Sequence, residues 1–187
     1  MNFEETKLKG AFIIDLEKIG DERGFFARAF CANEFLEHGI NDTMVQANMS
    51  TSKNKGTLRG MHFQVAPHQE GKLVRCIKGA LFDVIIDLRV CSDTYMEWFG
   101  VELNESNGRA LYVPKDFAHG FVTLTGDTTA FYMVSQFYTP AAELGVCWND
   151  PSFNIDWPIE PIVISDKDKS WPNFEKKCTV NIFNELL

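Results

Sequence analysis

The chain has 187 residues, a length that predicts one domain spanning residues 1–187 and large enough to bury a core without disulfides or metal ions. Its content of 45% hydrophobic and 13% aromatic residues excludes a disordered protein. A formal net charge of -8 argues against a nucleic-acid binder, because phosphate recognition needs Lys and Arg, although a few cations inside a pocket can still bind a small phosphorylated ligand.

The N-terminal part is predicted to contain one strand, one turn and one helix. Residues 11–16 have the composition of a strand, and residues 21–24 that of a turn. Residues 31–38 are predicted to form a helix, because Asn33 lies near its start and Gly39 just past its end.

The central part contains short strand-like runs separated by turn residues, and it lacks the helical stretches that a βαβ fold requires. This rhythm predicts a mainly β protein, an antiparallel sandwich or barrel. The predicted strands span residues 73–78, 81–90, 98–103, 110–113, 120–124 and 130–138. A charged turn is expected at residues 166–170.

We expect a cytoplasmic protein that does not contact membranes. The first ten residues contain no basic segment followed by an apolar run, and no later segment stays apolar long enough to span a bilayer. The cysteines are odd in number, lack CxxC spacing and mostly lie in apolar stretches, which favours reduced, buried thiols. They are Cys31, Cys76, Cys91, Cys147 and Cys178.

The densest polar cluster lies at residues 57–64 and is followed closely by residues 71–75. Alternation along a strand places His62 and Gln64 on one face, which Arg59 shares only if Gly60 permits a bulge. A structural histidine surrounded by solvated cations would explain any one of these residues alone, but the cluster as a whole favours a functional site.

Four further residues are candidates on weaker grounds. His119 lies in an apolar neighbourhood, where a buried neutral histidine is the simpler interpretation. Tyr132 and Tyr138 are predicted to share one face of a strand; each could be packing, but two phenols facing a cavity would be unusual in a plain core. Asp168 has the local sequence of a surface charge.

Nine motifs of the chain resemble those of one known family in order and in spacing, from the first strand to Trp171. They are DERGFF (21–26), VQAN (45–48), LRGMHFQ (58–64), GKLVR (71–75), PKDFAHGF (114–121), YTP (138–140), WNDP (148–151), DWP (156–158) and SDKD (165–168). The family is that of the dTDP-4-dehydrorhamnose 3,5-epimerases.

The resemblance implies a cupin-like jelly-roll β-barrel with a few short helices, usually a homodimer, that uses no metal or other cofactor. It implies an isomerase that inverts C3 and/or C5 of a nucleotide-diphosphate 4-keto-6-deoxy sugar through an enolate. Such a reaction belongs to the biosynthesis of deoxysugars or of surface polysaccharides such as lipopolysaccharide or capsule.

The resemblance also implies roles for individual residues. It makes His62 the base, Asp168 the carboxylate that orients it, Lys72 the enolate-stabilising cation and Tyr132 the general acid. The residues implied to contact the substrate are Arg59 and His119, and those implied to hold the nucleotide and its phosphates are Arg23, Phe26, Gln46, Asn48 and Tyr138.

These residue types suit the chemistry. A hydrogen beside a C4 carbonyl is acidic because the carbanion delocalises to an enolate, and the unperturbed pKa of histidine lies near neutrality, where a base is needed. A cation such as Lys72 at the developing oxyanion can contribute roughly 3 to 4 kcal/mol. A phenol on the opposite face would return the proton and so invert the carbon.

Departures from the family pattern leave the nucleotide open. Arg28 stands where the family often has Glu, and an arginine cannot accept the imide hydrogen of thymine or the N1 and N2 hydrogens of guanine. The base of a dTDP, GDP or CDP sugar is therefore not decided by the sequence. Two smaller departures are Met133, where Lys is frequent, and Phe137, where Tyr is frequent.

Two other hypotheses remain. A sugar ketoisomerase or metal-dependent cupin would bind a metal ion through His62 and His119, with His68 and Glu70 as further ligands, but Gln64 replaces the second histidine of the usual His-x-His pair. A non-catalytic sugar-nucleotide-binding module is the third, although binding alone does not require an opposed acid and base.

Overall fold

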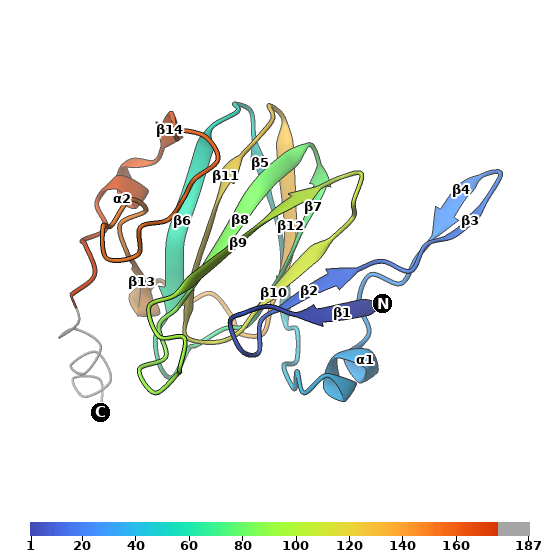
Figure 1. Ribbon diagram of the computed structural model, residues 1–187, viewed down its shortest axis with the longest axis horizontal. Helices are drawn as coiled ribbons and strands as arrows, with labels where there is room; N and C mark the ends of the chain where they lie inside the picture. The colour runs from blue at the N-terminus through green and yellow to red at the C-terminus, as the bar shows by residue number, and fades with distance from the viewer. Residues whose placement is uncertain (176–187) are drawn as a thin grey trace.

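The computed structural model describes residues 1–175, whose main body consists of two largely antiparallel sheets facing each other (Figure 1). The first sheet has the order β1 (Asn2–Glu5), β2 (Phe12–Asp15), β10 (Ala110–Val113), β7 (Lys72–Lys78), β12 (Thr128–Val134) and β5 (Gln46–Ser52). The second has the order β13 (Glu143–Gly145), β6 (Thr57–Gln64), β11 (Phe117–Thr123), β8 (Ala80–Asp87) and β9 (Trp98–Asn104), and β14 (Val163–Ile164) also pairs with β6.

The prediction of a mainly β, cupin-like jelly-roll barrel with a few short helices is confirmed. The helices are α1 (Ala32–Glu37), the 3-10 turn η1 (Pro140–Ala142) and α2 (Asp166–Lys169). Two strands end earlier than predicted: β8 stops at Asp87, and β12 stops at Val134, so that Tyr132 and Tyr138 do not share a strand. β11 begins earlier than predicted, at Phe117.

The space between the sheets is apolar at one end and polar at the other, and the same strands supply both parts. On β7, Val74 and Cys76 point into the core, and alternation carries Lys72 to the same face. On β12, Ala130 belongs to the core and Tyr132 packs against its edge. The same alternation along each strand therefore places apolar side chains in the core and polar side chains at the other end of the space between the sheets.

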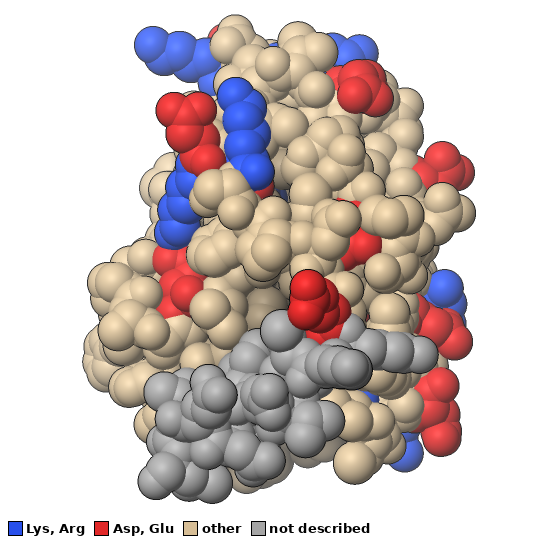
Figure 2. Space-filling view, turned by 90° about the vertical axis from the view of Figure 1, so that its left-hand side faces the viewer, with Lys and Arg blue, Asp and Glu red and all other residues tan. Residues whose placement is uncertain are grey.

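Two further apolar clusters lie on the outer faces of the sheets. Phe35 of α1 packs with Tyr112 and Leu73 over the first sheet. The segment after β13 covers the second sheet, where Val146 and Phe153 pack on buried strand residues. On this side of the molecule, uncharged residues cover most of the middle of the surface (Figure 2).

A hairpin of β3 (Ile19–Asp21) and β4 (Gly24–Phe26) extends away from the body of the molecule (Figure 1). We call residues 19–26 the arm. The turn predicted at residues 21–24 closes it, and Arg23 there pairs with Asp21. Its apolar side chains have little to pack on: Ile19 is 71% exposed and Phe26 is 72% exposed.

The cysteines are only partly as predicted. Cys76 is buried, Cys31 and Cys147 are intermediate, and Cys91 is exposed; all four are free thiols. The expectation of burial is therefore wrong for Cys91, which lies in the loop after β8, and Cys178 lies outside the described residues. Among residues 1–175, none of the helices has the length and apolar character that a membrane span needs.

Gly60 and Gly120 allow β6 and β11 to approach closely at a bulge. His119 pairs with His62 but Phe121 pairs with Arg59, so the register shifts between them, as the bulge hypothesis for Gly60 required. A Cβ on Gly120 would lie 2.7 Å from the Arg59 carbonyl oxygen and 3.0 Å from the Gly60 Cα. Neither backbone atom has room to move within the paired strands.

We therefore expect Gly120→Ala to destabilise the fold by about 2 to 3 kcal/mol, because overpacking between paired strands forces the backbone apart. Urea unfolding measures the difference. Gly20→Ala on the arm is the control, since a Cβ there would meet nothing closer than the Gly24 carbonyl oxygen at 3.6 Å. Equal stability of the two variants would contradict the assignment of a tight contact.

Candidate active site

Two adjoining pockets of about 290 and 300 Å³ share His62, Lys72 and Tyr132, and together they form one cavity between the sheets. The first pocket is also lined by Gln46, Asn48, Phe63, Gln64, Glu70, Val134, Tyr138 and Glu143. The second is also lined by Ser50, Arg59, His119, Phe121, Ser165, Lys167 and Asp168. Nine of the eleven predicted site residues therefore line one cavity.

His62 and Asp168 form a hydrogen-bonded pair with 2.6 Å between Nε2 and Oδ1. The His62 side chain is 27% exposed and that of Asp168 only 6%. Because Nε2 faces the carboxylate, Nδ1 is the ring nitrogen left to accept a proton from a ligand. The pair has the arrangement of a general base with an orienting acid.

The C-terminal segment brings Asp168 to His62. β14 runs parallel to β6 along the edge that β13 also uses, and α2 follows with Ser165 as its N-cap. The Ser165 hydroxyl oxygen accepts the Asp168 N–H at 3.1 Å. Burial opposes ionisation of Asp168, but hydrogen bonds from His62, Ser165 and the Gly60 N–H outweigh it and hold the pKa of Asp168 below its ordinary value.

Tyr132 lies on β12 of the first sheet, whereas His62 lies on β6 of the second. Burial raises the pKa of Tyr132, and the nearby charge of Glu70 raises it further, while Arg59 acts in the opposite direction. The phenol is therefore protonated at neutral pH. An acid on one sheet and a histidine on the other can reach a ligand from two sides.

Lys72 lies on the cavity wall and forms an ion pair with Glu70 at 3.1 Å. Sequence reasoning considered Glu70 only as a metal ligand and missed this pairing. A carboxylate two residues before a lysine at the start of a strand gives no indication by itself, because the loop conformation decides whether the two side chains meet.

Arg59 and His119 line the second pocket from β6 and β11. Arg59 donates to Ser52 Oγ at 3.2 Å and to the Thr51 carbonyl oxygen at 3.3 Å, and within residues 1–175 it has no carboxylate partner. His119 Nε2 lies 2.7 Å from Oδ1 of the fully buried Asp83. Asp83, on β8, is a second residue that sequence reasoning missed.

Gln46, Asn48 and Tyr138 meet at the other end of the cavity. Gln46 donates to Asn48 Oδ1 at 3.1 Å and accepts the Tyr138 backbone N–H at 3.3 Å. Tyr138 reaches the cavity from the loop after β12, where its hydroxyl donates to Glu143 at 2.5 Å. Lys167 pairs with the same carboxylate at 2.6 Å and thereby connects α2 to β13.

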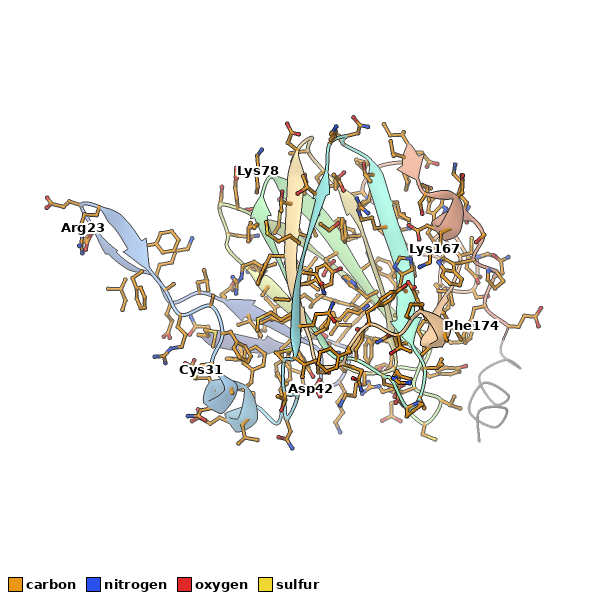
Figure 3. All side chains as sticks on the ribbon, turned by 180° about the vertical axis from the view of Figure 1, so that it is seen from behind. Arg23, Cys31, Asp42, Lys78, Lys167 and Phe174 are labelled. Carbon is orange, nitrogen blue, oxygen red and sulfur yellow. The ribbon has the colours of Figure 1, made fainter. Side chains whose placement is uncertain are left out.

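Arg23 and Phe26 are not in the cavity. Both lie on the arm, and Figure 3 shows Arg23 at its tip, on the opposite side of the molecule from Lys167. The predicted binding residues therefore divide into a set that lines the cavity of this chain and a pair that points away from it.

The side chains in the cavity do not form a group of metal ligands. No three or more His, Cys, Asp and Glu side chains among residues 1–175 are arranged to hold an ion. His62 and His119 each present Nε2 to a separate aspartate. Gln64 donates to the His68 carbonyl oxygen and to Glu70.

We expect Asp168→Asn to lower the free energy of unfolding by about 1 to 2 kcal/mol at neutral pH, because it removes a charged hydrogen-bond acceptor from a buried pair. The pKa of Asp168 is lower in the folded than in the unfolded chain, so its contribution is complete above about pH 4 and is lost as the pH falls through the folded value. Denaturant unfolding from about pH 7 to about pH 3 measures this.

Asp166→Asn is the matched control, since Asp166 lies on the same helix with a fully exposed side chain. We expect it to differ little from the unsubstituted chain over the whole range. A stability loss in Asp168→Asn that did not diminish with falling pH would contradict a charged Asp168.

Comparisons with known proteins agree on one family. A family model described as dTDP-4-dehydrorhamnose 3,5-epimerase matches residues 5–176. A protein of that name from Methanothermobacter thermautotrophicus is 45% identical over 172 residues, which are 90% of this chain and 92% of the relative.

Solved structures are similar over nearly the whole chain. The dTDP-4-dehydrorhamnose 3,5-epimerase of Elizabethkingia anophelis is 39% identical with a TM-score of 0.91, covering 95% of this chain and 98% of that one. A dTDP-6-deoxy-D-glucose-3,5-epimerase of Legionella pneumophila, in complex with dTDP-4-keto-L-rhamnose, is 39% identical with a TM-score of 0.88, covering 100% of this chain and 96% of that one.

Proposed function

Because the chain belongs to the dTDP-4-dehydrorhamnose 3,5-epimerase family, we propose that it inverts C3 and C5 of a dTDP-linked 4-keto-6-deoxy sugar. The chain is an isomerase that epimerises a nucleotide-linked keto-deoxy sugar. One observation carries the finer proposal. His62, which is paired with Asp168, and Tyr132 come from opposing sheets, and both line the same cavity as Lys72.

The first step removes a proton. His62 Nδ1 takes the hydrogen from a carbon beside the C4 carbonyl, so that the C–H bond breaks and its electron pair forms an enolate. The imidazolium is stabilised by Asp168, which stays ionised. Lys72 Nζ stabilises the negative charge on the C4 oxygen.

The second step returns a proton to the opposite face. The Tyr132 O–H bond breaks, a new C–H bond forms and the enolate reverts to the ketone. The imidazolium then loses its proton to solvent and the phenolate takes up a proton from solvent, which restores both groups. The same cycle at the other carbon beside C4 gives the doubly inverted sugar, and no oxidant or reductant is consumed.

Arg59 is our candidate for binding the diphosphate, because it is a cavity cation without a carboxylate partner among the described residues. We propose dTDP as the nucleotide, since both solved relatives act on dTDP sugars by name. Arg28, which departs from the family pattern, is paired with Glu34 at 2.9 Å. The product would enter cytoplasmic synthesis of a deoxysugar or a surface polysaccharide.

In D2O, we expect the protein to catalyse the exchange of hydrogen for deuterium at C3 and C5 of a dTDP-linked 4-keto-6-deoxy sugar. NMR spectra of the sugar measure this exchange. His62→Ala should reduce exchange at least about 100-fold, because general base catalysis is lost. Tyr132→Phe should still exchange but not invert, since the proton can then return only from the face of His62.

GDP- and CDP-linked 4-keto-6-deoxy sugars are the substrate controls. Exchange by His62→Ala at the unsubstituted rate would refute the base assignment. Inversion by Tyr132→Phe at the unsubstituted rate would refute the acid assignment, and exchange at one carbon alone would restrict the reaction to that carbon.

We also propose that the chain is a homodimer in which the arm of one subunit completes the cavity of the other. The arm carries Arg23 and Phe26, which resemble nucleotide-binding residues but cannot reach the cavity of their own chain (Figure 1, Figure 3). The exposure of Ile19 and Phe26 supports a partner surface for the arm.

We expect Arg23→Ala alone to lower kcat/KM about 10- to 100-fold, through loss of a charged hydrogen bond to phosphate. Refolding an equal mixture of His62→Ala and Arg23→Ala should then restore activity, because a mixed dimer has one cavity with an intact His62 and an intact arm from its partner.

A mixture of His62→Ala and Asp168→Asn is the control, since both residues belong to the same cavity and cannot complement each other. If the refolded mixture of His62→Ala and Arg23→Ala is no more active than the more active of these two variants alone, the arm does not act in the cavity of the partner.

A further inference from the structure

We propose that Glu70 is a positioning residue of the reaction, whose carboxylate holds the Lys72 ammonium group on the cavity wall that faces His62 and Tyr132. This inference rests on the proposed function and extends it to a residue that the sequence motifs did not include. It concerns how Lys72 is positioned and how Tyr132 is kept protonated before a substrate binds.

The geometry holds Glu70 by both oxygens. Oε1 lies 3.1 Å from Lys72 Nζ, and Oε2 accepts a hydrogen bond from Gln64 Nε2 at 3.3 Å. The Glu70 side chain is 12% exposed and that of Lys72 10%. A buried pair of this kind is far less screened by solvent than a surface ion pair.

Gln64 is itself fixed and therefore anchors Glu70. Its amide nitrogen donates to the His68 carbonyl oxygen at 3.1 Å, and its Oε1 accepts the Thr139 backbone N–H at 2.6 Å. Gln64 is buried on β6, two residues from His62. The chain of contacts from Gln64 through Glu70 to Lys72 thus ties the second sheet to the first across the cavity.

Lysine requires such a restraint. Its ammonium group is a point charge on a flexible four-carbon stem, and the rotamer freedom of that stem opposes any single position. An oxyanion is stabilised well only by a donor placed beforehand where the charge develops. Glu70 supplies that placement, and its second oxygen remains bonded to Gln64 while Lys72 acts.

Glu70 also acts on the acid. Its negative charge disfavours ionisation of Tyr132 and contributes to the raised pKa of that phenol, after the larger effect of burial. The other titratable or charged groups that line the cavity with Tyr132 come from β6, β7, β11, β13 and the C-terminal segment. They are Arg59, His62, Lys72, His119, Glu143, Lys167 and Asp168. Removing the charge of Glu70 would take away one of the effects that raise the pKa of Tyr132, so that this pKa should fall.

The test is Glu70→Gln, an isosteric change that removes the charge and retains an oxygen for Gln64. The chain has only four tyrosines, so that 13C-labelled tyrosine can be followed by NMR during a pH titration of the substrate-free protein, with Tyr132→Phe assigning the signal. We expect the Tyr132 midpoint to move to lower pH in Glu70→Gln.

Kinetics provide the second measurement. We expect Glu70→Gln to lower kcat about 10- to 100-fold with little change in KM, because Lys72 is misplaced at the oxyanion rather than removed. Glu70→Asp keeps the charge on a shorter side chain, so its Tyr132 midpoint should stay near the unsubstituted value while kcat falls. Glu70→Asp also tests the positioning of Lys72, through the fall in kcat, if Glu70→Gln fails to fold.

Asp15→Asn is the matched control, since it removes one negative charge from an Asp15–Arg109 pair at 2.9 Å on β2, away from the cavity. It should change neither the Tyr132 midpoint nor kcat. An unchanged Tyr132 midpoint together with an unchanged kcat in Glu70→Gln would overturn the proposal. The titration needs no substrate. It therefore tests the effect of Glu70 on Tyr132 even if the protein does not epimerise dTDP sugars.

Discussion

The active site depends on how the edge of β6 is shared. β13 pairs with its C-terminal half at Gln64 to His62, and β14 pairs with its first residues at Thr57 and Leu58. The carboxylate of Asp168 reaches the stretch between them, where it meets the Gly60 N–H and His62 Nε2. Two residues 106 positions apart in the chain can therefore form a hydrogen-bonded pair because two short strands leave this part of the edge open.

Each of three carboxylates in the cavity has a basic partner before any ligand binds. Asp168 pairs with His62, Glu70 with Lys72 and Glu143 with Lys167. A buried carboxylate is costly unless it is paired, and the side chains of Asp168, Glu70 and Glu143 are each at most 12% exposed, so these partners allow three carboxylates to lie in a small volume. Arg59, at the exposed rim and without a carboxylate among residues 1–175, is left to attract an anion. The net charge of -8 is therefore compatible with the diphosphate binding that we propose for Arg59.

The sequence was sufficient for the parts of the fold that repeat locally. Strand-like runs between turn residues located β7, β9 and β10 nearly to the residue. Alternation showed that Arg59 could share the face of His62 only with a bulge at Gly60, and the structure has a register shift there. It was not sufficient for pairings across the barrel. Asp83 and Glu70 have no local signal, because each becomes meaningful only when folding places it beside His119 or Lys72. Asp168 was found only through the family resemblance.

The barrel also explains why an epimerase can be built with so few groups. In the proposed mechanism, inversion requires a base and an acid on opposite faces of one carbon, and two facing sheets supply such positions. His62 on β6 and Tyr132 on β12 belong to separate ladders of backbone hydrogen bonds, which hold the two side chains on opposite sides of the cavity. The alternation that packs Val74 and Ala130 into the core also fixes the inward direction of Lys72 and Tyr132. In the proposed mechanism, stability and stereochemistry therefore depend on the same strand register, and a one-residue slip of β7 or β12 would remove both together.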